Sequence, residues 1–172
     1  MEHASYELQL LGSALDGKLD WVTGLYWYYE DGVEHSPGDV LYAIQPTKNP
    51  FTQVSTISNT SYSIFGQGTY HFNDEWSMTA GARWTYDDKE MEVSAGDPTS
   101  CALSDGMGLL PMDQCDVSMS ESFSQPTGTV SLEYKPNAFT MFYASSRLGY
   151  RAGGFNARAA TPEEYQPFDQ ET

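Results

Sequence analysis

Polar and apolar residues alternate with a period of two along most of the chain, which is typical of β-strands with one apolar face. The clearest segment is 76–87, where apolar or aromatic side chains occupy the even positions and small or polar ones the odd positions. Five more segments show the same pattern: 5–11, 19–30, 61–72, 125–134 and 139–146. In 139–146 the apolar face begins with Phe139, Met141 and Tyr143. The helical period is nearly absent, so the pattern predicts an all-β chain of about six strands.

The connections between these segments alternate between short and long. The short ones, at 12–17, 73–75 and 135–138, contain the glycine, asparagine, aspartate and proline residues that favour tight turns. The long ones run through roughly 31–57, 88–122 and 150–172. A soluble sandwich has no physical need for short connections on one side of the sheet and long ones on the other. This difference is typical of an antiparallel transmembrane β-barrel, whose up-and-down hairpins have short periplasmic turns and long extracellular loops.

Aromatic residues at both ends of the apolar faces support the same interpretation. We predict an aromatic girdle at each membrane interface, with Tyr70, Phe72, Trp76, Tyr134 and Phe139 near the short turns and Trp27, Tyr29, Trp84 and Tyr86 near the long loops. From Trp76 to Trp84 a strand extends ~27 Å, or ~20 Å along the membrane normal at a tilt of ~40°, near the ~25 Å apolar band. Cross-strand packing in a soluble sheet is the alternative explanation.

The composition excludes several other classes of protein. The 172 residues carry a formal net charge of −16, which makes the chain a poor nucleic-acid binder. Of the 24 acidic residues, 17 fall within 30–57, 87–121 and 150–172, away from the apolar strand faces. A hydrophobic content of 40% is too high for a disordered acidic tail, and no apolar run approaches the ~20 residues of a membrane helix.

Six runs of the sequence are distinctive: 7–10, 20–26, 63–70, 79–86, 168–172 and the longest, 142–156, which reads FYASSRLGYRAGGFN. In their order and spacing these runs resemble the barrel of TonB-dependent receptors. By this resemblance, residues 1–172 are part of a receptor barrel from which the plug domain and the remaining strands are absent. The whole receptor is expected in the outer membrane of a Gram-negative bacterium, in contact with lipid and lipopolysaccharide. The resemblance implies uptake of a scarce nutrient, most often a ferric siderophore, driven by the TonB energy-coupling complex.

Few residues are candidates for site chemistry. Arg83, Arg147 and Arg151 are placed to contact an anionic ligand at the lumen or outer rim, and pairing with luminal acids or plug backbone is the structural alternative. Cys101 and Cys115 share one predicted extracellular loop, where an oxidising exterior favours a disulfide over two free thiols.

The remaining polar groups predict no reaction chemistry. The acidic residues of the long loops have no calcium-loop spacing and are interpreted as solvated surface. Adjacent Glu163 and Glu164 do not have the arrangement of a glycosidase pair. We therefore expect no catalytic, cofactor-binding or metal site and no enzyme activity. The alternative function is a soluble extracellular β-sandwich that binds carbohydrate, which predicts aromatic residues gathered on one concave face.

Overall fold

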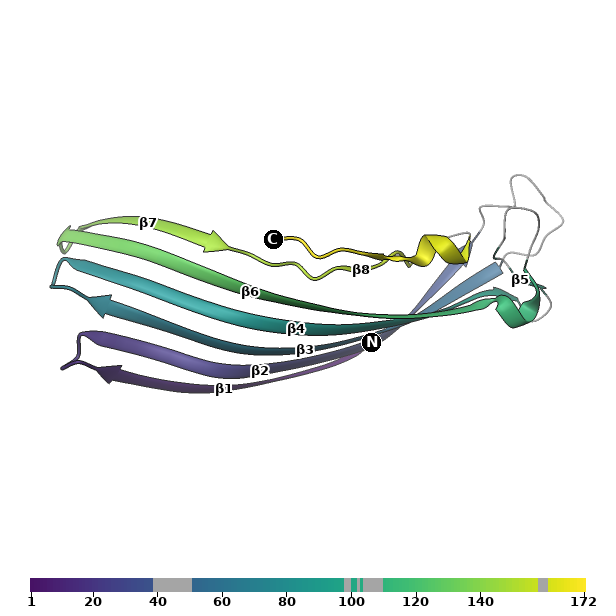
Figure 1. Cartoon of the computed structure of the whole chain (residues 1–172), viewed down its shortest axis with the longest axis horizontal. Helices are drawn as coiled ribbons and strands as arrows, with labels where there is room; N and C mark the ends of the chain where they lie inside the picture. The colour runs from purple at the N-terminus through teal and green to yellow at the C-terminus, as the bar shows by residue number, and fades with distance from the viewer. Residues whose placement is uncertain (39–50, 98–99, 102, 104–109, 158–160) are drawn as a thin grey trace.

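The computed structural model describes residues 1–38, 51–97, 100–101, 103, 110–157 and 161–172. Its main feature is a curved antiparallel sheet in which each long strand pairs with the next along the chain (Figure 1). The long strands are β1 (Glu2–Ala14), β2 (Leu19–Gly38), β3 (Phe51–His71), β4 (Trp76–Asp97), β6 (Asp116–Asn137) and β7 (Thr140–Leu148). This confirms the predicted up-and-down, antiparallel architecture. Among the described residues the sheet is open, with β1 and β7 at its edges.

Shorter elements lie at the end of the sheet far from the tight turns. β5 (Ser100–Cys101) pairs with the end of β4, and η1 (Met112–Gln114) precedes β6. After β7 the chain continues outward through β8 (Gly154–Phe155) and η2 (Pro162–Tyr165), then doubles back through β9 (Pro167–Phe168), which pairs with β8 (Figure 1). We call residues 149–157 and 161–172 the C-terminal return. No helix in the described ranges is long and apolar enough to cross a membrane.

Tight turns gather at one end of the sheet, and local chemistry explains them. Between β1 and β2, Leu15, Asp16 and Gly17 all have positive φ. Between β3 and β4, the Asn73 side-chain oxygen accepts hydrogen bonds from the backbone N–H groups of Glu75 (2.9 Å) and Trp76 (2.8 Å). Such side-chain bonds close a turn without help from distant residues, so these turns were predictable from sequence.

The sheet has two faces of opposite character. One cross-strand row on the outer face consists of Leu8, Leu25, Ile64 and Trp84, which are 54–63% exposed. On the inner face, Gly24, Phe65, Arg83 and Thr127 form the matching row. An exposed apolar face of this extent is unfavourable in water and is the surface that hydrocarbon requires.

Beyond the aromatic rows the strands are longer than predicted, and the polarity of the two faces reverses. β4 runs on to Asp97, with acidic Glu90 and Glu92 on its outer face and buried Met91, Val93 and Ala95 on its inner face. The prediction that 31–57 and 88–122 are loops is therefore wrong for 31–38, 51–57, 88–97, 100–101 and 116–122, which are strand. The rest of these two loops includes 39–50, 98–99, 102 and 104–109, which lie outside the described residues.

A small hydrophobic cluster lies on this inner face, beyond the polar part of the wall. Its buried members are Met91, Val93, Ala95, Cys101, Leu103, Cys115 and Tyr165. Phe155 and Ala157 of the C-terminal return pack against it. Burial of apolar side chains thus attaches the C-terminal return to the wall. This attachment is possible because the inner face is apolar at this end of the sheet.

β7 departs from the predicted alternation. An irregularity in its pairing with β6 between Tyr134 and Asn137 shifts the register, so Phe142 stacks beside Tyr134 on the outer face. Tyr143 then lies opposite Glu133 on the inner face, which contradicts the apolar face predicted from Phe139, Met141 and Tyr143. Phe139 itself lies in the turn before β7 and is 98% exposed.

Gly24 is required by a close approach between three strands. A Cβ atom there would lie 2.5 Å from the Leu8 carbonyl oxygen and 2.6 Å from the Phe65 ring. We expect Gly24→Ala to lower the free energy of unfolding by ~1–3 kcal/mol, because backbone must move to admit the methyl group. The measurement is the urea midpoint of the receptor that contains this wall. Gly66→Ala is the matched control, since its nearest neighbour would be 3.7 Å away, and equal midpoints for the two variants would contradict the prediction.

Candidate functional site

Arg83 lies on the inner face and is held by the wall itself. Its Nη2 donates to Ser63 Oγ (2.7 Å) and its Nε to Thr85 Oγ1 (3.2 Å). The guanidinium also lies over the Tyr26 and Phe65 rings, 5.1 and 5.8 Å from their centroids. Hydrogen bonds and aromatic faces from three neighbouring strands therefore position this charge. These printed partners of Arg83 are hydroxyl groups and aromatic rings, which differ from the acids and plug backbone named above as the structural alternative. Contact of Arg83 with a ligand stays a prediction.

A pocket of about 350 Å³ lies between the inner face and the C-terminal return. We call it the inner pocket. β3 and β4 supply one side and the return supplies the other, so residues far apart in sequence meet there. Its lining includes Ile57, Asn59, Lys89 and Met91 from the wall and Arg151, Gly153, Phe155 and Phe168 from the return. Its size is within the range of small-molecule sites, and it combines apolar rings with a few polar groups.

Among the basic residues that the structure describes, Lys89 and Arg151 line the inner pocket. Lys89 Nζ donates to the Gly153 carbonyl oxygen (2.7 Å), which ties the return to β4. Arg151 Nη1 lies 3.9 Å from Glu171 Oε2, and both side chains are 77% exposed, so this ion pair contributes little to stability. This ion pair therefore holds the Arg151 guanidinium only weakly.

Tyr150 fixes the start of the return beside the pocket. Its hydroxyl donates to Asp87 Oδ2 (2.9 Å). Burial raises the pKa of the Tyr150 hydroxyl, and the hydrogen bond and negative charge of Asp87 raise it further. The phenol thus stays protonated at physiological pH and remains a donor. Farther along, Gln53 Nε2 donates to the Ala157 carbonyl oxygen, and Gln170 Nε2 to Gln125 Oε1 (3.3 Å).

The structure does not bring the three predicted arginines together. Arg147 is exposed on β7 opposite Thr129, on the inner face of an edge strand, and does not line the inner pocket. Arg151 lines it, and Arg83 is held within the wall. Sequence reasoning missed Lys89, Phe155 and Phe168. The signal that could have identified Lys89 is the continued alternation through 88–97, where apolar residues change to odd positions.

Cys101 and Cys115 form a disulfide in the structure, with their Cα atoms 5.4 Å apart. Both are buried in the hydrophobic cluster beneath the return. The bridge joins the strand paired to the end of β4 with the residue that precedes β6. Neither cysteine lines the inner pocket, so the position of the disulfide indicates a structural role.

Aromatic rings form two sets on the outer face. Near the tight turns, Tyr70 packs edge-on against Phe72, and Trp76 stacks on Tyr134 with ring centroids 4.4 Å apart. At the other end, Trp27 stacks between Tyr6 (5.5 Å) and Tyr29 (6.3 Å), in the row that continues through Tyr62 and Tyr86. Tyr6, Tyr62 and Phe142 belong to these sets and were missed. Assignment of the two sets to membrane interfaces stays a prediction.

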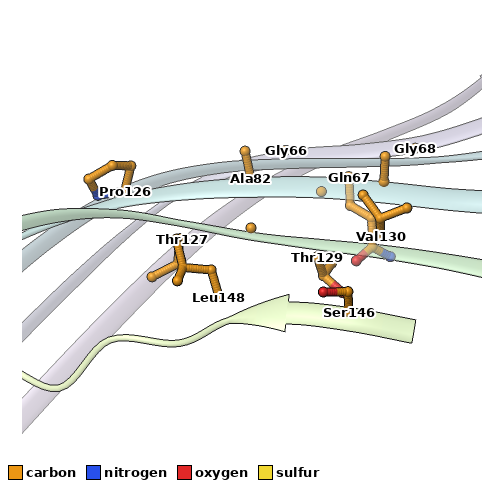
Figure 2. Close-up of a pocket in the computed structure, with 13 residues that line it drawn as sticks. Gly66, Gln67, Gly68, Ala82, Pro126, Thr127, Thr129, Val130, Ser146 and Leu148 are labelled. Atoms are coloured by element: carbon orange, nitrogen blue, oxygen red, sulfur yellow. The ribbon is translucent and has the colours of Figure 1, made fainter. Parts of the chain in front are cut away.

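Between the aromatic sets the outer face is hollowed by small side chains. Gly66, Gly68, Ala80, Ala82 and Gly128 form the floor of a groove of about 730 Å³. Figure 2 shows Pro126 and Leu148 toward one end of this groove and Val130 and Ser146 toward the other. The groove faces the same side as Trp84, so it belongs to the apolar surface rather than to the inner pocket.

Comparison with known proteins identifies the family. A family model described as TonB dependent receptor-like, beta-barrel, matches residues 3–172. The chain belongs to the TonB-dependent receptor family. This family comprises outer-membrane receptors of Gram-negative bacteria. The soluble sandwich is not favoured, because aromatic residues lie at both ends of the outer face instead of on one concave surface.

A solved structure shares the fold of this TonB-dependent receptor chain. The ferric yersiniabactin uptake receptor FyuA from Yersinia pestis superposes with a TM-score of 0.74 at 19% sequence identity. The match covers 98% of this chain and 24% of FyuA, so the chain spans about a quarter of that receptor's length. None of the curated proteins compared with the chain matches it. Within the described ranges, no three His, Cys, Asp or Glu side chains are grouped to hold a metal ion.

Replacing Cys101 and Cys115 together by serine is expected to loosen the cluster beneath the return. The bridge closes a segment with a sequence separation of 14, for which the chain-entropy effect is ~3 kcal/mol. We expect faster proteolytic cleavage within 98–118 and unchanged heat resistance of the barrel in detergent gels. Reductant should reproduce the effect in the parent receptor. Met112→Ser, at an exposed neighbouring site, is the control and should leave the cleavage rate unchanged. Equal cleavage rates of the parent and the double variant would contradict the prediction.

Proposed function

We propose that the chain contributes wall strands and their extracellular extension to a receptor that imports a scarce nutrient across the outer membrane. The supporting observation is the pair of faces on the same strands. The outer face is apolar with aromatic residues at both ends, and the polar inner face leads to a ligand-sized pocket. A soluble binding module needs no such outer face, whereas a transport barrel needs both.

The open sheet supports a larger barrel around this wall. β1 and β7 have one unpaired edge each among the described residues, and hydrocarbon offers no partner for exposed N–H and C=O groups. We infer that further strands of the whole receptor pair with both edges. Coupling to TonB, through a plug, and contact with lipid and lipopolysaccharide are likewise proposed for that whole receptor.

We propose a ferric siderophore as the ligand class. Lys89 and Arg151 offer positive charge, and Phe155 and Phe168 offer aromatic rings, within one pocket. Anionic chelates with aromatic groups match this combination of charge-assisted hydrogen bonds and ring contacts. The name of FyuA, a ferric yersiniabactin uptake receptor, supports the class without specifying the compound.

The test is growth of a receptor-deletion strain, complemented with variants, on a panel of ferric siderophores as the iron source. We expect the Lys89→Met, Arg151→Gln double variant to need ~10–100-fold more siderophore for half-maximal growth, because each lost charge-assisted hydrogen bond costs ~1.5–3 kcal/mol before compensation. Lys135→Gln is the matched control, since Lys135 pairs with Glu133 near the opposite end of the wall.

Receptor abundance in outer-membrane fractions must be equal for all strains. Growth that is independent of the receptor on every siderophore would refute the ligand class. Unchanged uptake by the double variant, with the receptor still required, would refute the inner pocket as the contact site.

A further inference from the structure

An apolar cleft opens on the outer face at the aromatic row far from the tight turns. We call it the outer cleft; its volume is about 650 Å³. Its floor is aliphatic and its sides are aromatic, with outer-face lining residues Leu8, Leu25, Ile64, Tyr6, Trp27, Tyr62, Trp84 and Tyr86. Trp84 is 59% exposed, and its indole N–H donates to Ser124 Oγ (2.6 Å), which orients the ring at the edge of the cleft.

The outer face changes character immediately beyond this cleft. The next cross-strand row consists of Tyr29, Thr60, Asp88 and Ser122, and the row after it of Asp31, Ser58, Glu90 and Ser120. These two rows present hydroxyl and carboxylate groups and contain no basic residue. Along one direction of the wall, therefore, an aliphatic floor gives way to aromatic rings and then to hydrogen-bonding groups.

This order matches the order of chemical groups along one lipid molecule, from its acyl chain to its headgroup. It does not match the surface of another protein. Acyl chains fill apolar clefts in a membrane-facing wall, and Trp and Tyr lie where chain meets headgroup. The carboxylates of Asp31, Asp88 and Glu90 repel a phosphate headgroup, and they repel the same surface of a second copy. Carboxylate and hydroxyl oxygens accept hydrogen bonds from sugar hydroxyls, which carry no charge.

We propose that the outer cleft binds an acyl chain of an outer-leaflet glycolipid, with its sugar hydroxyls on Asp88 and Glu90. The inference rests on the outer-membrane location in the proposed function but not on the nutrient or on the inner pocket. Trp84 covers the junction between chain and sugar, and Ser124 holds its ring in place.

The test uses the whole receptor that contains this wall, purified in detergent, and native mass spectrometry to count bound lipid. The probe is dephosphorylated lipid A, which keeps sugars and acyl chains, and phosphatidylglycerol is the comparison; both are added in EDTA. We expect the parent receptor to retain lipid A at least fivefold better than phosphatidylglycerol. Trp84→Ala and the cleft-filling Ile64→Trp should each lower lipid A retention at least fivefold.

Trp76→Ala is the matched control, because Trp76 lies on the same strand in the opposite aromatic set, and its lipid A retention should equal the parent's. The double variant Asp88→Asn, Glu90→Gln should weaken retention of lipid A. Tighter retention of lipid A by this variant would show that the carboxylates only repel lipid. Equal retention of lipid A and phosphatidylglycerol by the parent receptor would show that the sugar has no role in binding. Either outcome overturns the proposal, as does an unaffected Trp84→Ala variant.

Heat resistance in detergent gels verifies that each variant is folded. If Trp84→Ala fails to fold, Ile64→Trp still tests the outer cleft, because it retains the apolar character of the wall. The binding measurement is independent of uptake. A receptor that retains lipid A but supports no growth on siderophores fails the proposed function alone, whereas one that transports but retains no lipid A fails this inference alone.

Discussion

Continuous pairing of backbone N–H and C=O groups between neighbouring strands is the constraint on which the rest of the structure depends. In hydrocarbon an unpaired backbone group costs several kcal/mol, so every strand must keep one register with the next over the whole membrane depth. A slip of one residue would exchange the two faces of a strand. Arg83 would then face lipid and Trp84 the lumen, and both the apolar surface and the inner pocket would be lost.

The same strands serve two environments because the residues on their two faces exchange character part-way along. Within the apolar zone the inner side is polar and water-compatible, and beyond it the inner side becomes a hydrophobic cluster. This cluster gives the C-terminal return an apolar surface to pack on, and the return completes the pocket with Arg151 and Phe168. The inner pocket is thus built by burial at the end of the sheet far from the tight turns rather than by loops alone.

Much of this fold was readable from local sequence, and the exceptions have physical causes. The strands and the turn at Asn73 depend on alternation and on side-chain bonds within a few residues, so they were predicted. The face of β7 was wrong because the irregular register after Tyr134 shifts the alternation by one position. The strand at 88–97 was interpreted as loop because its acidic residues Asp88, Glu90 and Glu92 lie outward. Lys89 and Phe168 meet only through a contact between distant segments, which leaves no local pattern.

Contacts of the C-terminal return also have a consequence for the order of assembly. Wall strands pair with their immediate successors, whereas the contacts of Tyr150 with Asp87, Lys89 with Gly153 and Gln53 with Ala157 join residues 63, 64 and 104 positions apart. Closing such long segments costs chain entropy that only a preformed surface repays. Zippering of adjacent hairpins therefore precedes docking of the return, and the pocket matures last. A receptor arrested early in biogenesis would have a complete wall but no inner pocket.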